Sequence, residues 1–342
     1  AARPAPAARV RLPVQLQGQR VVGGVRLGDG RTLSALVDTG SGNLVVPSEH
    51  CGSPGCRDKR RFRPEMDEGG RFLGGGATEV HLSFAGAHLA GGGFEGRVCL
   101  GEACGQVGFV VAAWLSDAFG GLGFDALLGL GPPRQALSPE FSLLGRLVQQ
   151  GVLPQPAFTL SLRRSSPSEI VLGSDELGQG TAANDTTAAG TVAARMPADA
   201  AHGEWAVRLQ GAALGGRRFL DCTSEGGCRA VLDSGCPGIA LPDEAFRTLQ
   251  ALLPPLTDCS PEAIGALPLL QFALGDSAVF DVRPEHYVGV ATTGPDGCRY
   301  NLQGVGDTST RTVVLGVPFL LDRDVAFDQG RMRVGATGGR PE

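Results

Sequence analysis

Two copies of one short motif, Asp38-Thr39-Gly40 and Asp233-Ser234-Gly235, lie in opposite halves of the chain. Each copy ends an apolar run and opens a turn. A carboxylate at the end of a buried strand is costly unless hydroxyls and backbone N–H groups surround it, and the Thr or Ser of the motif can supply a hydroxyl. The glycine allows a tight turn and the close backbone approach that two facing loops would need.

A single Asp-Thr-Gly triplet is ordinary turn chemistry, because Asp and Gly are common in β-turns. Two copies in matching surroundings are harder to explain in that way. Apolar residues precede both copies, and apolar segments follow both at similar distances, at residues 43–47 and 238–242. The pattern indicates the two halves of a pseudo-repeat.

The composition favours an all-β protein with many turns. The 53 glycines and 23 prolines interrupt short apolar runs that are rich in Val and Leu. The 342 residues are enough for two domains with sizeable cores. Helical patterns are short, and residues 139–150 and 242–253 are predicted to be helical. Both tryptophans, Trp114 and Trp205, are expected to pack in cores.

Charge and hydropathy argue against two classes of partner. The net charge is −5 and the charges are dispersed, so we expect no nucleic-acid partner. The one basic cluster, at residues 57–63, is interpreted as a solvated surface stretch. No apolar run approaches the ~20 residues that span a bilayer, so we expect no transmembrane segment.

The two motifs belong to longer segments, residues 36–48 and 230–242, that resemble the catalytic segments of the pepsin-like aspartic proteases. The segments 126–131, 314–319 and 325–335 are similar to further parts of that family, and the resemblance covers nearly the whole chain. It implies an all-β, bilobal pepsin-like fold with two pseudo-symmetric β-domains, a central cleft and a few short helices. The implied catalytic residues are Asp38 and Asp233, supported by Thr39, Gly40, Ser41, Ser234, Gly235 and Cys236.

The resemblance also implies an aspartic endopeptidase that works at acidic pH, with water activated between Asp38 and Asp233. The two carboxyl groups would share one proton, because two adjacent carboxylates cannot both ionise cheaply. Thr39 and Ser234 would join the loops through reciprocal hydrogen bonds, and Ser41 would bind Asp38. The implied partner is a peptide or protein substrate, and no metal or organic cofactor is required.

The chain departs from the family pattern in the hairpin flap that covers the cleft. Phe84 stands in the place of the flap Tyr, and Val45 stands where the family has the Trp that binds this Tyr. Losing both partners orphans no polar group, so we interpret the chain as a settled variant. The alternative function is that of a catalytically weak or inactive pepsin-fold protein with a binding or structural role in an assembly. The expected flap and substrate-binding residues are Phe84, Ala85, Gly86, Val45 and Ile239.

Nine cysteines in local pairs indicate an oxidising compartment and leave one cysteine over. A zinc site is the alternative, but Gly- and Pro-rich spacers without a neighbouring His suit a metal poorly. The cysteine left over is Cys236, where the family usually has Thr or Ser; we interpret it as an inert, buried side chain that could still change the protonation of the aspartates. The predicted bridges are Cys51–Cys56, Cys99–Cys104, Cys222–Cys228 and Cys259–Cys298, and all except the second resemble bridges of the family.

We expect residues 1–9 to be a mature N-terminal extension, residues 10–190 an N-terminal lobe with the first Asp and the flap, and residues 191–342 a C-terminal lobe with the second Asp. The join lies in the polar stretch 178–201, which contains a glycosylation sequon at Asn184. No leader begins the sequence, so we expect that a leader and a propeptide have been removed. These features favour the secretory pathway, with an extracellular or an acidic, vacuole-like or lysosome-like destination. We expect a monomer unless the chain is part of an assembly.

Overall fold

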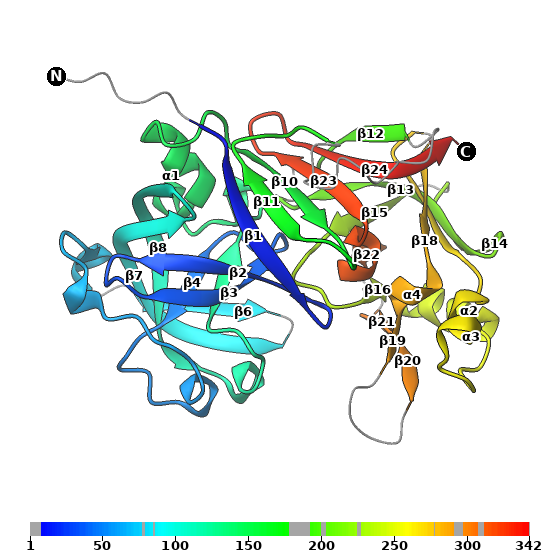
Figure 1. The fold of residues 1–342 in the computed structure, drawn as a ribbon, viewed down its shortest axis with the longest axis horizontal. Helices are drawn as coiled ribbons and strands as arrows, with labels where there is room; N and C mark the ends of the chain where they lie inside the picture. The colour runs from blue at the N-terminus through cyan, green and yellow to red at the C-terminus, as the bar shows by residue number, and fades with distance from the viewer. Residues whose placement is uncertain are drawn as a thin grey trace.

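The chain is built mainly of β-strands and forms two lobes that lie side by side, with a few short helices (Figure 1). This confirms the predicted all-β, bilobal architecture. None of the helices in the described part of the chain is long and apolar enough to cross a membrane. The computed structural model describes residues 8–341 apart from residues 77–78, 85, 178–191, 200–202, 224–226, 277, 291–296 and 307–310.

The described residues of the first half form eleven strands and one α-helix. Strand β1 alternates between buried and exposed positions, as a half-buried strand requires: Leu12 and Val14 are buried, whereas Arg11 and Pro13 are exposed. Strands β4, β9 and β10 are buried throughout. The elements are β1 (Val10–Gln17), β2 (Arg20–Leu27), β3 (Thr32–Asp38), β4 (Leu44–Pro47), β5 (Arg71–Phe72), β6 (Glu79–Phe84), β7 (Ala87–Leu100), β8 (Ala103–Leu115), β9 (Ala126–Gly129), α1 (Leu143–Gln149), β10 (Ala157–Leu162) and β11 (Ser168–Leu172).

The described residues of the second half form the remaining strands and four short helices. The predicted helix at residues 242–253 is confirmed as α2. The elements are β12 (Val192–Pro197), β13 (Ala206–Leu214), β14 (Arg217–Asp221), β15 (Cys228–Leu232), β16 (Ile239–Leu241), α2 (Asp243–Leu252), α3 (Pro261–Gly265), β17 (Leu270–Leu274), β18 (Ala278–Val282), α4 (Pro284–Tyr287), β19 (Val288–Val290), β20 (Cys298–Tyr300), β21 (Leu302–Gly304), β22 (Thr312–Leu315), α5 (Val317–Leu320), β23 (Arg323–Asp328) and β24 (Arg333–Pro341).

Each lobe contains the same arrangement of three strands around its Asp motif. In the first lobe, β3 lies parallel to β9 with Asp38 opposite Gly129, and β4 returns antiparallel to β9. In the second lobe, β15 lies parallel to β22 with Leu232 opposite Leu315, and β16 returns antiparallel to β22. The pseudo-repeat of the sequence is therefore a structural repeat. The first Asp motif connects β3 to β4, and the second connects β15 to β16.

One antiparallel sheet joins the two halves, in the order β1–β11–β10–β23–β24–β12. In Figure 1, β1 crosses the middle of the molecule beside β10 and β11. Strands from the beginning and the end of the chain thus share one sheet. The lobe boundary at residue 190 stays a prediction, because residues 178–191, with the sequon at Asn184, lie outside the described residues.

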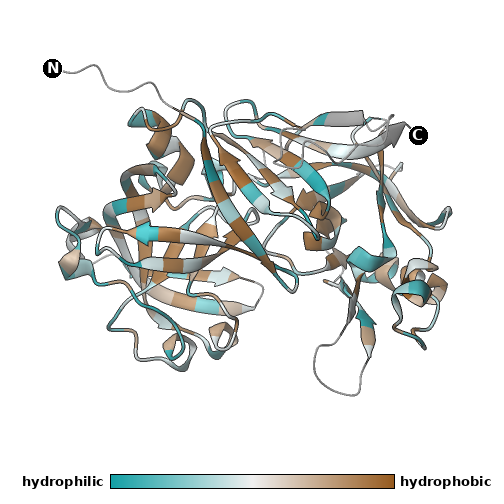
Figure 2. Ribbon diagram, viewed as in Figure 1, coloured by the Kyte–Doolittle hydropathy of each residue, from teal (hydrophilic) through white to brown (hydrophobic). Residues whose placement is uncertain are grey.

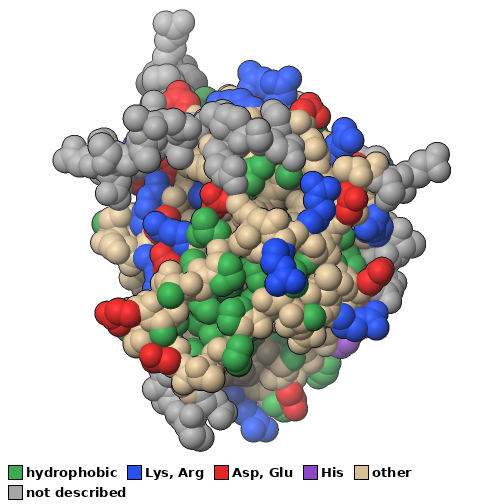
Figure 3. Space-filling model, turned by 90° about the vertical axis from the view of Figure 1, so that its right-hand side faces the viewer, with side chains coloured by type: hydrophobic (Ala, Val, Ile, Leu, Met, Phe, Trp, Pro, Cys, Tyr) green, Lys and Arg blue, Asp and Glu red, His purple; other side chains and the backbone are tan. Residues whose placement is uncertain are grey.

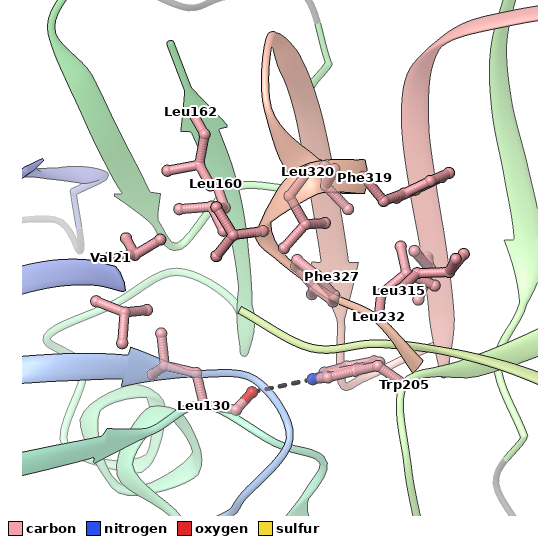
Figure 4. Packing of buried hydrophobic residues seen from close by; sticks show 14 of the residues in the cluster. Val21, Leu130, Leu160, Leu162, Trp205, Leu232, Leu315, Phe319, Leu320 and Phe327 are labelled. Atoms are coloured by element: carbon pink, nitrogen blue, oxygen red, sulfur yellow. Dashed lines mark hydrogen bonds between the residues drawn. The ribbon is translucent and has the colours of Figure 1, made fainter. Parts of the chain in front are cut away.

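The largest apolar cluster includes buried side chains of both lobes and of the central sheet. Figure 2 shows apolar segments along the strands of both halves. Within this cluster, Phe158 stacks on Phe327 at 4.7 Å between ring centroids, and Trp205 lies 5.3 Å from Phe327. Trp205 has no exposed surface, which confirms that prediction, and its Nε1 donates a hydrogen bond to the carbonyl oxygen of Leu130 at 3.0 Å (Figure 4).

Two sequence predictions were wrong in part. Residues 139–150 form a 3₁₀ turn and then α1, because Ser142 between them has an extended backbone. Trp114 is 46% exposed and does not pack in a core. The pairing of β7 with β8 shifts register between Ala90 and Gly91, and such a bulge interrupts the alternation of inward and outward side chains.

The interpretation of the basic cluster at residues 57–63 as a solvated stretch was wrong for Lys59, which is buried, whereas Arg57, Arg60 and Arg63 are exposed. Its Nζ donates to the carbonyl oxygen of Phe124 at 2.8 Å and lies 5.4 Å from the centre of the Phe124 ring. Burial lowers the pKa of the Lys59 ammonium, and the carboxylate of Asp58 partly opposes this effect. Arg60 binds Asp125, immediately before β9, with 2.9 Å between Nε and Oδ2. The cluster therefore ties its loop to the first lobe.

Replacing Trp205 by Phe should destabilise the protein, because the carbonyl of Leu130 would lose its donor in an apolar surrounding. We expect the free energy of unfolding to fall by about 1 to 3 kcal/mol in a denaturant titration. The matched control is Trp114→Phe at an exposed position, which should change it by less than about 0.5 kcal/mol. Equal effects of the two substitutions would contradict the structural role of the Trp205 hydrogen bond.

Candidate active site

The two Asp motifs meet through reciprocal hydrogen bonds between their hydroxyl residues. The hydroxyl of Thr39 donates to the carbonyl oxygen of Leu232 at 2.9 Å and accepts from the backbone N–H of Ser234 at 2.9 Å. The hydroxyl of Ser234 donates to the carbonyl oxygen of Val37 at 2.7 Å and accepts from the backbone N–H of Thr39 at 3.1 Å. Both side chains are fully buried, so these four bonds are shielded from water.

Each carboxyl group lies against the opposite loop. A Cβ atom placed on Gly40 would lie 2.6 Å from the carboxyl carbon of Asp233, and one on Gly235 would lie 2.5 Å from Oδ1 of Asp38. A real Cβ atom does not fit at such distances, so both positions require glycine for close approach. The structure therefore brings Asp38 and Asp233 together from positions 195 residues apart in their motifs.

Backbone donors hold both carboxyl groups, and a side-chain hydroxyl also binds the first. The N–H of Gly40 donates to Oδ1 of Asp38 at 2.9 Å, and the N–H of Gly235 donates to Oδ1 of Asp233 at 2.8 Å. The hydroxyl of Ser41 donates to Oδ2 of Asp38 at 2.5 Å. The orientation of each carboxyl is thus fixed mainly by its own turn.

Burial and like charge both act on the second aspartate. Burial is the larger cause and the charge of Asp38 the next, and together they raise the pKa of Asp233 well above its ordinary value. The N–H groups of Gly235 and Cys236 act in the opposite direction but do not outweigh them. One proton on the pair is therefore strongly favoured over two negative charges.

Cys236 follows the second motif and is the free cysteine. Its thiol donates to the carbonyl oxygen of Gly238 at 3.3 Å. Burial raises the pKa of the thiol to about 11, so it remains neutral near physiological pH. A neutral thiol is a poor nucleophile, and this environment does not favour covalent chemistry at Cys236.

The hairpin of β6 and β7 is the segment that the sequence predicts as the flap. Phe84 lies opposite Ala87 at its end, and Gly86 has the positive φ of +83° that the turn needs. The expected flap residue Ala85 lies outside the described residues. Phe84 is half-buried and packs against the smaller apolar cluster, which includes Val45.

The other two expected contact positions lie deeper in the protein. Val45 is 3% exposed, and it pairs with Val110 of β8 and Leu127 of β9. Ile239 is fully buried in the larger core and pairs with Leu315 of β22. In this conformation Ile239 offers no surface to a substrate, so its assignment as a contact residue stays a prediction.

Sequence reasoning missed a set of hydrogen bonds that hold the loop of the first Asp motif. Gln135 donates from Nε2 to the carbonyl oxygen of Gly40 at 3.1 Å, and Asn43 donates from Nδ2 to the carbonyl oxygen of Gln135 at 3.2 Å. The N–H of Leu137 then donates to Oδ1 of Asn43 at 3.0 Å. No pattern in the sequence pairs residue 135 with residue 40, because the contact depends on how the segment after β9 returns.

One group of side chains has the spacing of a metal site. Ligand atoms of Glu49, His50 and Glu65 all lie within 4.8 Å of one another in the described part of the chain. A hydrogen bond with Glu65 raises the pKa of the Glu49 carboxyl, and Arg63 lies 3.3 Å from Glu49. This group is largely exposed and its charge is already partly compensated, so it could hold a cation only weakly.

All four predicted disulfides are present. Cys99 and Cys104 lie directly opposite each other at the end of the β7–β8 hairpin, so spacing alone was sufficient for that pair. Cys222 and Cys228 precede the second Asp motif and fix the segment that enters β15. Cys259 and Cys298 close the longer loop, as predicted.

Comparison with known proteins agrees with this geometry. The family model for eukaryotic aspartyl protease matches residues 22–338, and the chain belongs to that family. Human napsin-A is 30% identical over 324 residues, which cover 90% of this chain and 74% of napsin-A. Cathepsin E-B of Xenopus laevis is 24% identical over 321 residues, covering 89% of this chain and 75% of the relative. Pepsin A of Sus scrofa is 26% identical over 321 residues, covering 88% of this chain and 76% of that pepsin.

Substituting Thr39 by Val should weaken the connection between the two Asp-motif loops and so lower the free energy of unfolding. The change keeps the shape but leaves the N–H of Ser234 and the carbonyl of Leu232 buried without their partner. We expect a loss of about 2 to 4 kcal/mol in the free energy of unfolding, measured by denaturant titration. Thr39→Ser keeps the hydroxyl and should lose less than about 1.5 kcal/mol. If the Val and Ser variants are equally stable, the hydroxyl does not join the loops.

Proposed function

We propose that this chain is an aspartic endopeptidase in which Asp38 and Asp233 activate water against a peptide bond. The observation that carries the proposal is the meeting of two carboxyl groups, each packed against the opposite Asp-Thr/Ser-Gly turn. The reciprocal bonds of Thr39 and Ser234 hold the turns together. Membership of the aspartyl protease family supports the same reaction class.

The chemistry requires one ionised and one protonated carboxyl group. The ionised group takes a proton from a water molecule, whose oxygen attacks the carbonyl carbon, while the protonated group donates its proton to the carbonyl oxygen. A tetrahedral diol results. The diol then collapses. One diol hydroxyl returns a proton to the group that was protonated at the start, and the group that took the proton from water gives it to the leaving nitrogen. The C–N bond breaks, and both carboxyl groups return to their starting states.

The proposed substrates are peptides or proteins with apolar side chains near the cut. Phe84 at the end of the hairpin and the smaller apolar cluster against which it packs support this preference. In Figure 3, positive and negative side chains are interspersed over the outer face of the second lobe, with apolar groups between them. This mixed face does not favour a polyanionic partner. We also propose that the chain is a monomer unless it is part of an assembly.

The proposed location is the secretory pathway, ending outside the cell or in an acidic, vacuole-like or lysosome-like compartment. Four disulfides support this, because such bridges persist in oxidising compartments. The reaction itself favours an acidic destination, since one carboxyl must keep its proton.

A second candidate function is binding without efficient catalysis. It is favoured by Phe84 in the hairpin and by Val45 in β4. These residues stand where the pepsin-like aspartic proteases have the Tyr and the Trp that form the flap hydrogen bond. Both apolar side chains belong to or pack on one cluster, so the variant arrangement is well packed and not damaged. Loss of that bond could lower turnover while the cleft still binds peptides.

Hydrolysis of an unfolded protein substrate tests the proposal. We expect cleavage that is maximal in acid across a series from about pH 2 to about pH 7, and lost when the pair is fully ionised or fully protonated. Asp38→Asn should lower kcat at least about a thousandfold, because no carboxylate can then take the proton from water.

A statine-type transition-state mimic is the matched control. It should abolish cleavage by the unaltered chain and bind less tightly to Asp38→Asn, since it is complementary to the carboxyl pair. Absence of cleavage at every pH by a folded chain would overturn the enzyme assignment. Retained peptide binding in that case would support the second candidate.

A further inference from the structure

The two loops that carry the Asp motifs differ in chemistry at the position three residues after each Asp. Ser41 lies three residues after Asp38, and Cys236 lies three residues after Asp233. The hydroxyl of Ser41 donates to Oδ2 of Asp38 at 2.5 Å, whereas the thiol of Cys236 donates to the carbonyl oxygen of Gly238. The repeat therefore places a hydroxyl on one carboxyl and turns a thiol away from the other.

The first carboxyl consequently has a hydroxyl donor in addition to a backbone donor. Asp38 accepts from the N–H of Gly40 on Oδ1 and from Ser41 on Oδ2. Among the described residues, Asp233 accepts from the backbone N–H groups of Gly235, on Oδ1, and of Cys236, and no hydroxyl donates to it. Donors stabilise a carboxylate more than a neutral carboxyl, so the pattern favours charge on Asp38.

We infer that Cys236, by withholding a hydroxyl donor from Asp233, makes Asp233 the member of the pair that holds the shared proton, and extends activity to higher pH. This inference rests on the proposed endopeptidase function for its kinetic consequence. Asp38 then takes the proton from water and Asp233 donates to the carbonyl oxygen. Cys236 is a positioning residue, because it acts through Asp233 and does not itself touch the reacting atoms.

The surroundings of Asp233 leave few other groups to set its protonation. The titratable groups that act on it from the described residues are Asp38 on the facing loop and Cys236 on its own loop. The thiol is neutral in the relevant range, since its pKa is raised to about 11. Restoring a hydroxyl would stabilise the carboxylate of Asp233, so its proton would leave at lower pH.

The experiment compares pH profiles of kcat/KM for the unaltered chain, Cys236→Ser and Cys236→Ala. We expect the alkaline limb of the Cys236→Ser profile to move by about one to two pH units toward acid, as a new hydrogen bond to a charged group predicts. Cys236→Ala supplies no donor, so its limb should stay within about 0.3 pH units of the unaltered chain. If the thiol has a purely structural role, both substitutions should change kcat/KM by similar amounts at every pH. The alkaline limb of the profile should then stay at the same pH in both variants.

A second readout does not depend on turnover. Carboxyl ¹³C signals of labelled aspartate, assigned with Asp233→Asn, report the higher pKa of the pair directly. It should fall in Cys236→Ser and stay unchanged in Cys236→Ala. Equal values in all three proteins would overturn the inference even if all three cleave substrate, and the endopeptidase assignment would then stand. If none cleaves, that assignment fails, and the carboxyl titration alone decides whether Cys236 places the proton.

Discussion

The pair of side chains Thr39 and Ser234 is the constraint on which the site depends. Each hydroxyl donates to a backbone carbonyl of the other half and accepts a backbone N–H from it, with donor–acceptor distances from 2.7 to 3.1 Å. Since both residues are fully buried, breaking any of these bonds would leave polar groups without water or a partner. The two halves therefore cannot slide apart at this point without a large cost in free energy.

That constraint explains why the carboxyl groups of Asp38 and Asp233 tolerate each other. Alone, two neighbouring buried carboxylates would repel and separate. Here, Gly40 and Gly235 let each carboxyl lie against the opposite turn, and the fixed loops prevent separation. The electrostatic cost is relieved by retaining a proton, which is also the state that the proposed water activation needs. The hydrogen bonds that hold the two loops together thus also favour the singly protonated state of the carboxyl pair.

Support for this arrangement continues behind the loops. Trp205 of the second half binds the carbonyl of Leu130, whose own N–H donates to the carbonyl of Asp38 at 2.8 Å. Gln135 holds the carbonyl of Gly40 from the other direction. The departures of this chain from the family pattern, at the hairpin and at Cys236, lie outside this framework. We propose that they change the hairpin that covers the site and the protonation of the carboxyl pair, while the architecture remains.

The sequence by itself determined the all-β class, the two Asp motifs, the four disulfides and the helix α2. These features follow from local pattern, short spacing or a resemblance spread along the chain. Only the tertiary structure decided that Lys59 is buried against Phe124, that a bulge leaves Trp114 exposed, and that Ile239 lies in the core. It alone also showed the bond from Gln135 to Gly40 and the direction of the Cys236 thiol. The physical reason is that burial and donor choice depend on which neighbours the folded chain supplies, and local sequence does not specify those neighbours.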